Sequence, residues 1–311
     1  MAEGGEDDWP ATRAWVARFL DEGERIDRVE LLRGGWTSRM RRLHVNGPRS
    51  RRALVLRSFV KPFFVRHAHG LLSREAAILR LLGGTNVPVP RLIAVDATAD
   101  HCEHPSLLMT SLPGQVRLDD AGASDRFDLL ARQLTQLHRV PVADRSRPRE
   151  YQAWTTPDGV AVPHGADAAL WRRAIAAIRR EPPAYQPCLL HRDFHPGNVL
   201  FTGHGGDTRI SGVVDWVEVS WGPADLDVAH CATALALLHG PEHGLAFADR
   251  YLAAGGHLSP HATDRLYWRL LDALAYAPDA AKVAGPWREL GRVDFTPAVL
   301  SGRLAAYLAL L

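Results

Sequence analysis

The amino-acid sequence predicts an α+β fold with two lobes, an N-terminal lobe built mainly of strands and a mainly helical C-terminal lobe. Short segments rich in aliphatic and β-branched residues dominate the chain before residue 111, and longer stretches with a helical apolar period dominate after it. The turn Ser111-Leu112-Pro113-Gly114 separates the two regions. With 311 residues and 46% hydrophobic content, the chain can bury a sizeable core. We therefore expect lobes over residues 1–111 and 112–311.

The predicted N-terminal lobe alternates strands with two helices. Residues 29–40 are typical of two strands joined by a glycine turn at Gly34-Gly35, and the double glycine Gly83-Gly84 ends the second helix. In order, we expect a leading helix over 9–22, strands on either side of the glycine turn, a strand over 53–57, a helix over 71–82, and strands over 91–96 and 106–110.

The glycine turn is a candidate phosphate-binding element. Two glycines followed by Thr37 and Ser38 can bring backbone N–H groups and a hydroxyl close to a phosphate. A Gly-Gly hairpin is also common as plain architecture, so this alternative stays open.

The strand over 53–57 places Val55 and Arg57 on one face, because side chains of a strand alternate with period two. An apolar residue suits an adenine, and a cation one step further suits the phosphates. In the helix over 71–82, Glu75 lies on or beside the apolar stripe, where an unpaired carboxylate would be costly. Arg57 is its expected partner, and a local contact with Arg74 is the alternative.

The C-terminal lobe is predicted to be a set of helices around a central loop. Ser124 is the expected N-cap of the first helix, and the proline-rich segment 141–167 is expected to be an irregular insert. The predicted helices cover residues 125–140, 168–181, 224–238, 243–254, 259–277 and 297–311, with a turn at Trp221-Gly222-Pro223 before the third of them.

The central loop carries the clearest chemical pattern. His191-Arg192-Asp193 and Asn198 lie between apolar strands, and a further strand over 209–214 delivers Asp215. His-x-Asp-x4-Asn followed by a strand-borne Asp is the spacing of the catalytic loop and metal-binding Asp of protein kinases. Phosphoryl transfer needs a carboxylate to orient the attacking hydroxyl and oxygen ligands for magnesium. We therefore predict Asp193 as the base and Asn198 with Asp215 as Mg²⁺ ligands; a simple turn is the alternative.

The composition argues against several other classes of protein. The net charge is +2, and 37 basic residues are interspersed with 35 acidic ones, so a nucleic-acid partner is not expected. Cys102, Cys188 and Cys231 are odd in number and far apart, which indicates reduced thiols of a cytoplasmic protein. The acidic, polar N-terminus does not have the pattern of a signal peptide, and the longest apolar runs are too short to span a bilayer.

The order of these features along the chain resembles that of the aminoglycoside phosphotransferase family. The features are the glycine turn, Val55 with Arg57, Glu75, the 112–114 connector, the central loop, Asp215 and the segment from Gly222 to Asp227. This family has a protein-kinase-like fold and is similar to choline, homoserine and fructosamine kinases. The resemblance spans residues 28–311. It implies an N-terminal five-stranded antiparallel sheet with one helix, a helical C-terminal lobe, and a nucleoside triphosphate between them.

The resemblance also implies roles for individual residues. Asp193 would be the catalytic base, and Asp227 would support the loop that carries it. ATP or GTP would be bound with Thr37 and Ser38 over its phosphates, Met109 at the back of the base pocket, and backbone groups of Thr110 and Leu112 at the base. Asn198 and Asp215 would hold Mg²⁺. His195 would reach the transferred phosphate or hold the loop.

Three positions depart from the usual pattern of the family. Arg57 stands where many relatives have Lys, and a guanidinium is bulkier than an ammonium although it also binds phosphate. Arg192 stands where many antibiotic kinases have Gly. Asp215-Trp216-Val217 replaces Asp-Phe-Gly, so we do not expect the activation-loop switch of protein kinases.

The leading hypothesis is a kinase that phosphorylates a hydroxyl of a small molecule, most plausibly an aminoglycoside-like antibiotic. Residues 112–258 carry 17 acidic and 14 basic residues, a slight bias toward a cationic acceptor. Glu218 is a candidate substrate contact or a plain surface carboxylate. The alternatives are a metabolite kinase acting on choline, a sugar or an amino acid, and a nucleotide-binding pseudokinase.

Overall fold

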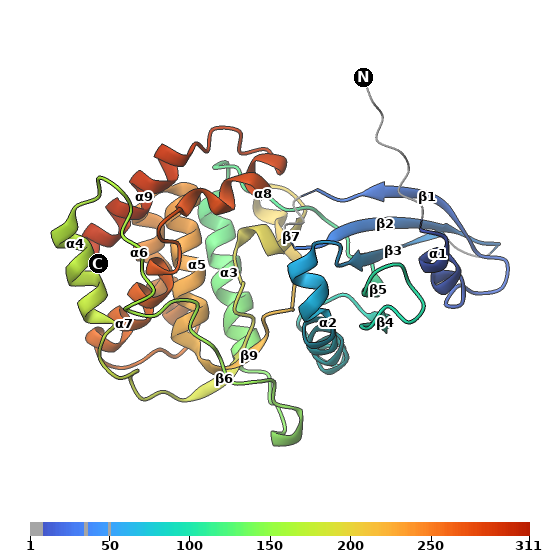
Figure 1. The fold of residues 1–311 in the computed structure, drawn as a ribbon, viewed down its shortest axis with the longest axis horizontal. Helices are drawn as coiled ribbons and strands as arrows, with labels where there is room; N and C mark the ends of the chain where they lie inside the picture. The colour runs from blue at the N-terminus through green and yellow to red at the C-terminus, as the bar shows by residue number, and fades with distance from the viewer. Residues whose placement is uncertain (1–8, 34–36, 49–50) are drawn as a thin grey trace. The chain divides into compact units, whose positions relative to one another are not determined.

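The computed structural model describes residues 9–33, 37–48 and 51–311. The α+β fold class is confirmed, with an antiparallel sheet in the first part of the chain and mostly helices in the second (Figure 1). The chain divides into two compact units. The sheet unit comprises Met1–Gly84 and Val89–Leu112, and the helical unit comprises Thr85–Pro88 and Pro113–Leu311.

The sheet unit is built on a five-stranded antiparallel sheet with the order β1-β2-β3-β5-β4. The strands are β1 (Arg25–Leu31), β2 (Arg39–Asn46), β3 (Arg51–Ser58), β4 (Leu92–Asp96) and β5 (Ser106–Thr110). Trp15 and Val16 of α1 (Pro10–Ala17) pack with buried side chains of β2, β3 and β5 to form a small core. Helix α2 contacts β4 and β5.

Helix α2 (Pro62–Leu82) begins nine residues before the predicted start at 71. Pro62 occupies its first turn, where a missing backbone N–H costs nothing. The added turns carry exposed apolar side chains, with Phe63 57% exposed, so the sequence has no amphipathic period there. The end at Leu82, with Gly83 as cap, agrees with the prediction.

Arg57 of β3 and Glu75 of α2 form an ion pair inside the sheet unit. The Arg57 Nη1 and Glu75 Oε2 atoms are 3.3 Å apart, and the two side chains are 3% and 1% exposed. The predicted pairing is therefore confirmed, and it explains why a carboxylate is tolerated on the apolar stripe of α2.

Replacing Arg57 with lysine is expected to lower the free energy of unfolding by about 1 kcal/mol, because an ammonium keeps the charge but loses the planar guanidinium contact. Urea denaturation measures the change. Arg28→Lys is the control, since the side chains of the Arg28–Glu30 pair are 65% and 41% exposed, so this change should affect stability less. Equal losses in the two variants would contradict a special role for the buried pair.

The helical unit is organised around α5 (Ala224–His239), in which every residue from Asp225 to Leu238 is buried. Helices α3, α6, α7 and α9 pack against it. Because α5 is enclosed on all sides, each of its polar side chains needs a partner inside the protein. The other helices are α3 (Ala123–His138), α4 (Ala168–Ala177), α6 (Pro241–Ala253), α7 (Ala262–Leu274), α8 (Ala284–Glu289) and α9 (Pro297–Leu310).

Two short antiparallel pairs of strands frame the central loop. The strands β6 (Pro187–Leu190) and β9 (Ser220–Pro223) pair with each other, as do β7 (Val199–Thr202) and β8 (Arg209–Val213). The predicted turn at Trp221-Gly222-Pro223 is therefore wrong. Its backbone is extended because β6, thirty residues earlier, supplies a partner that a local pattern of Trp, Gly and Pro does not reveal.

The predicted start of the helix over 125–140 is also corrected. Helix α3 begins at Ala123 with Gly122 as N-cap, and Gly122 has φ 66°, a conformation suited to glycine. Ser124 lies inside the first turn, and its hydroxyl accepts a hydrogen bond from Arg250 of α6 at 3.1 Å. Tertiary contact, rather than capping, accounts for this serine.

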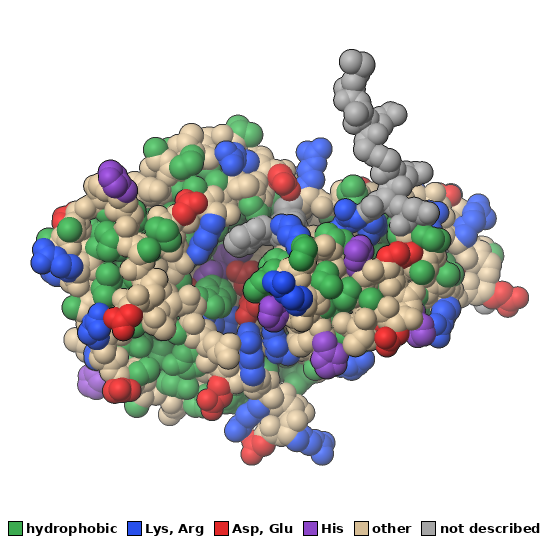
Figure 2. Space-filling model, in the orientation of Figure 1, with side chains coloured by type: hydrophobic (Ala, Val, Ile, Leu, Met, Phe, Trp, Pro, Cys, Tyr) green, Lys and Arg blue, Asp and Glu red, His purple; other side chains and the backbone are tan. Residues whose placement is uncertain are grey.

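The surface carries both signs of charge. On the face drawn in Figure 2, Lys and Arg side chains are interspersed with Asp and Glu side chains, as the sequence suggested. Of the helices that the structure describes, none is long and apolar enough to cross a membrane.

Candidate active site

The central loop connects β6 to β7 through a short turn, η2 (Pro196–Asn198). Its backbone closes on itself, because the Asn198 N–H donates to the His195 carbonyl at 2.9 Å. The His195 side chain caps this turn by accepting a hydrogen bond at Nδ1 from the Gly197 N–H, at 3.0 Å. This contact agrees with a loop-holding role for His195, and contact of His195 with the transferred phosphate stays a prediction.

Asp227, in the first turn of α5, fixes the start of the loop. Its two carboxylate oxygens accept hydrogen bonds from the backbone N–H groups of His191 at 2.7 Å and Arg192 at 2.8 Å. Burial favours the neutral acid, but the contact with His138 and the nearby positive charges outweigh it and lower the pKa of Asp227. The expected supporting role of Asp227 agrees with these contacts.

Arg192 and Asp215 both adopt left-handed backbone conformations, with φ of 72° and 66°. Such conformations cost free energy in residues other than glycine and persist only where the surrounding structure enforces them. At residue 192 the cause is the Asp227 clamp, which turns two successive N–H groups toward one carboxylate. A glycine at this position would take the same conformation without strain.

Asp193 is held at both carboxylate oxygens. Oδ2 accepts a hydrogen bond from Asn198 Nδ2 at 2.9 Å, and Oδ1 lies 3.1 Å from His230 Nε2 and 3.6 Å from His195 Nε2. Burial favours the protonated acid, but His195 and His230 outweigh it and lower the pKa of Asp193. The side chain is still 33% exposed, so an ionised and oriented carboxylate faces solvent.

The predicted metal ligands lie on adjoining backbone segments. The Val214 N–H donates to the Asn198 carbonyl at 3.0 Å, which brings Asp215 to the residue next to this link. The Asn198 amide nitrogen is occupied by the backbone and side chain of Asp193, so its carboxamide oxygen is the atom left to bind a cation. An amide oxygen and a carboxylate are hard ligands that fit Mg²⁺.

His191 and Trp216 join the loop to the segment that carries Asp215. His191 accepts a hydrogen bond at Nδ1 from the Asp193 N–H, and its Nε2–H donates to the Val214 carbonyl at 3.1 Å. The rings of His191 and Trp216 lie 4.3 Å apart. Burial lowers the pKa of His191, which favours the neutral ring that these two hydrogen bonds require.

The residues predicted to bind nucleotide in the sheet unit belong to the sheet and its edges. Val55 of β3 and Met109 of β5 are opposite each other in the register, and both are buried. The Thr110 N–H donates to the Arg91 carbonyl at 2.9 Å, so that amide is already engaged, and Leu112 ends the unit.

The two hydroxyl residues after the glycine turn lie beside β2. Thr37 is half-buried, and the buried Ser38 donates its hydroxyl to Met40 Sδ at 3.4 Å. The turn residues Gly34-Gly35 lie outside the described residues.

Three residues near Asp193 were not predicted. His230 of α5 contacts Asp193, Asp272 of α7 contacts His230, and Trp154 of the insert 141–167 packs its ring edge-on against His230 at 5.1 Å. The guanidinium of Arg192 lies over the Trp154 ring at 4.4 Å. The one available signal was a histidine on a helix otherwise buried all round, which needs polar partners.

Glu218, the candidate substrate contact, is paired within the protein. Its Oε2 lies 2.7 Å from Nη2 of Arg149, a residue of the insert. This pair ties the start of the insert to the segment that follows Asp215.

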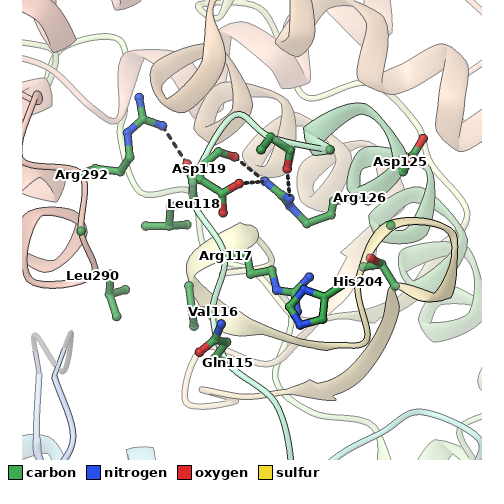
Figure 3. Close-up of a pocket in the computed structure, with 15 residues that line it drawn as sticks. Gln115, Val116, Arg117, Leu118, Asp119, Asp125, Arg126, His204, Leu290 and Arg292 are labelled. Carbon is green, nitrogen blue, oxygen red and sulfur yellow. Dashed lines mark hydrogen bonds and ion pairs between the residues drawn. The ribbon is translucent and has the colours of Figure 1, made fainter.

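A cavity of about 560 Å³ lies elsewhere in the helical unit (Figure 3). Of the described residues that line it, none belongs to the predicted catalytic set. The three arginines that line it donate hydrogen bonds to backbone carbonyls of the helical unit. Arg117 donates to the Gly203 carbonyl at 2.6 Å, Arg126 to the Ala121 carbonyl at 2.6 Å and Arg292 to the Leu118 carbonyl at 2.7 Å.

Comparison with known proteins agrees with this geometry. Residues 28–271 match the model of the phosphotransferase enzyme family. The chain is 27% identical over 220 residues to an aminoglycoside 3'-phosphotransferase of Streptomyces fradiae, covering 65% of this chain and 78% of that protein.

Solved structures share the fold. The GDP complex of aminoglycoside 2'-phosphotransferase-IIIa has a TM-score of 0.64 at 21% identity, covering 96% of this chain and 97% of that one. A ternary complex of aminoglycoside phosphotransferase APH(4)-Ia with AMP-PNP and hygromycin B has a TM-score of 0.62 at 19% identity, covering 92% and 94%. The chain belongs to the phosphotransferase enzyme family, whose members are enzymes that transfer phosphate to hydroxyl groups.

Proposed function

We propose that this protein transfers the γ-phosphate of ATP or GTP to a hydroxyl of an aminoglycoside-like antibiotic. The observation that carries the proposal is the Asp193 carboxylate, which is partly exposed and held at both oxygens on a loop clamped by Asp227. The relatives support the substrates: one is an aminoglycoside 3'-phosphotransferase, and two solved neighbours hold GDP, or AMP-PNP with hygromycin B.

Asp193 acts by orienting the acceptor hydroxyl and taking up its proton as the phosphate is transferred. Its low pKa keeps it ionised at neutral pH, so it is a ready hydrogen-bond acceptor and a weak base. This suits a phosphoryl transfer in which the proton leaves late and positioning dominates.

Asn198 and Asp215 would hold Mg²⁺ through the carboxamide oxygen and the carboxylate. When bound, the ion neutralises charge that develops on the phosphate oxygens. The link between Val214 and Asn198 keeps the two ligands on adjoining segments, so neither needs to move far to bind.

The sheet unit would bind the nucleotide. Val55 and Met109 offer an apolar surface to the base, and Thr110 and Leu112 offer backbone groups, although the Thr110 amide is already used within the sheet. Thr37 and Ser38 would approach the phosphates. The ion pair between Arg57 and Glu75 places a cation of β3 in a fixed position, as a phosphate-binding residue requires.

A metabolite kinase is the second candidate, and two observations favour it. Glu218 is paired with Arg149, and Asp272 is paired with His230, so both of these carboxylates near the catalytic loop have cationic partners. A weakly charged acceptor would then fit better than a polycation.

An assay of nucleoside-diphosphate release, ADP from ATP and GDP from GTP, over a panel of acceptors tests the proposal. Hygromycin B and other aminoglycosides are compared with choline, homoserine and neutral sugars, each with ATP and with GTP and with varied Mg²⁺. Turnover dependent on an aminoglycoside supports the proposal, and turnover with choline, homoserine or a sugar alone supports the second candidate. Tight nucleotide binding with no transfer to any acceptor would indicate a pseudokinase.

Trp154→Ala is expected to raise the acceptor KM by about 3- to 10-fold and leave the nucleotide KM unchanged. Trp154 is 41% exposed and contacts His230, so it offers an aromatic surface beside Asp193 on which a sugar ring can pack. Tyr185→Ala is the control, because Tyr185 is similarly exposed but packs on Tyr151 and Trp268. An unchanged acceptor KM in Trp154→Ala would exclude this role.

A further inference from the structure

His230 lies between two carboxylates in the helical unit. Its Nε2 is 3.1 Å from Asp193 Oδ1, and its Nδ1 is 3.0 Å from Asp272 Oδ1. The side chains of His230 and Asp272 are 4% and 1% exposed, so this contact is closed to solvent on the Asp272 side. The three residues come from the central loop, α5 and α7.

The hydrogen bonds define the protonation of His230. An ionised carboxylate has no hydrogen to donate, so each ring nitrogen that faces one must carry its own hydrogen. A neutral imidazole has only one N–H and would leave a nitrogen lone pair against a carboxylate oxygen. With both nitrogens facing carboxylates, His230 is an imidazolium.

The other groups around His230 do not alter this assignment. The ring of Tyr276 is stacked at 6.3 Å, that of Trp154 lies edge-on at 5.1 Å, and that of His195 lies 5.8 Å away. The Lys282 ammonium lies over the Tyr276 ring, 5.1 Å from its centroid, and interacts electrostatically with Asp272. Among these neighbours, Asp193 and Asp272 are the groups in hydrogen-bond contact with the ring.

We propose that His230, held by Asp272, is a positioning residue that fixes one oxygen of Asp193 and so sets how this carboxylate meets the acceptor hydroxyl. The proposal rests on the proposed function, in which Asp193 is the base. Asn198 holds the second oxygen from the other side, so the carboxylate plane is set by two donors from different elements. Turnover then depends on a residue that does not itself touch the acceptor or the nucleotide.

A metal ion bound between these side chains is the competing interpretation, because donor atoms of Asp193, His195 and His230 all lie within 4.8 Å of one another. The hydrogen bonds oppose it. His195 accepts at Nδ1 from the Gly197 N–H, so its Nε2 carries the hydrogen, and both nitrogens of His230 are occupied as described. Protons, rather than a metal, therefore link these side chains.

The charge on His230 predicts the alkaline side of the pH profile. Burial alone would lower its pKa, but Asp272 and Asp193 outweigh burial and raise the pKa of His230 to about 9. Because the folded pKa is raised, the imidazolium is fully present at neutral pH and is lost as the pH rises through about 9. We expect kcat to fall over the same range.

The test compares His230→Gln and Asp272→Asn with the wild type and with His239→Gln. His239 is on the same helix and contacts Asp120, far along α5 from Asp193, which makes it the matched control. Rates are measured from pH 6 to 10 as ADP release from MgATP, with hygromycin B and in parallel with water as acceptor. Thermal denaturation and MgATP binding verify that each variant is folded.

We expect His230→Gln to lower kcat by about 10- to 100-fold, to leave the nucleotide KM within about twofold, and to lose the fall near pH 9. Asp272→Asn should move that fall to lower pH, because one carboxylate that stabilises the imidazolium is gone. His239→Gln should match the wild type. Wild-type kcat and pH profile in His230→Gln would overturn the proposal.

A second measurement does not depend on activity. ¹⁵N NMR of the imidazole nitrogens in the wild-type protein should show His230 with both nitrogens protonated at pH 7, and a neutral or Zn²⁺-bound ring would overturn the proposal even if a variant fails to fold. Asp193→Asn separates the two hypotheses. Wild-type turnover in that variant would refute Asp193 as the base, whereas loss of turnover there together with an unaffected His230→Gln would refute only the positioning role.

Discussion

Asp193→Ala is expected to lower kcat by about two to four orders of magnitude, the usual contribution of a general base. The carboxylate is the group that the loop, Asn198 and His230 together hold in place, and no retained oxygen replaces it. The KM for nucleotide should change little, because Asp193 is proposed to contact the acceptor. Steady-state ADP release with the best acceptor of the panel measures the effect.

Two variants separate chemistry from folding in that experiment. Asp193→Asn keeps the shape of the side chain and removes its charge, so its kcat should fall nearly as far as that of Asp193→Ala. Asp207→Asn, on the exposed turn η3 (Gly205–Asp207), removes a carboxylate elsewhere in the helical unit and should keep wild-type turnover. Activity of Asp193→Ala near that of the wild type would refute the assigned role.

Asp227→Ala is expected to destabilise the protein by roughly 3–6 kcal/mol, because two buried backbone N–H groups each lose a charged acceptor. The left-handed conformation of Arg192 loses its restraint at the same time. Urea unfolding followed by circular dichroism measures the loss. For a typical domain a loss of this size removes much of the total stability.

Asp225→Asn is the matched control for Asp227→Ala. Asp225 is also in the first turn of α5 and accepts hydrogen bonds from Ser259, but its pKa is raised by burial, so a neutral amide is tolerated better there. We expect a loss of about 1 kcal/mol. If Asp227→Ala costs no more than Asp225→Asn, the clamp does not hold the loop.

Local patterns predicted the parts of the fold that depend on neighbours in sequence. The motif from His191 to Asn198 lies within one loop, so its spacing alone indicated which side chains could share chemistry. The pairing of Arg57 with Glu75 was predicted from three considerations: the alternation of side chains along a strand, the apolar stripe of a helix, and the free-energy cost of burying an unpaired carboxylate. These inferences needed no knowledge of the tertiary structure.

The parts that were wrong or missed depend on distant partners. The local pattern predicts a turn where strand β9 lies, because the strand that pairs with it is thirty residues away. His230 and Asp272 come from different helices, and Trp154 comes from an irregular insert, so no spacing in the sequence links them. The start of α2 was missed because its exposed apolar side chains do not follow the helical period.

The attachment of the catalytic loop to α5 couples catalysis to the cooperative unfolding of the helical unit. Asp227 belongs to α5, in which every residue from Asp225 to Leu238 is buried, so the loop that Asp227 holds cannot loosen by itself while this helix stays folded. A destabilising substitution at a buried apolar residue of α5 such as Leu235, away from Asp227 and His230, should therefore reduce the amount of folded enzyme, and the molecules that remain folded should turn over at their normal rate.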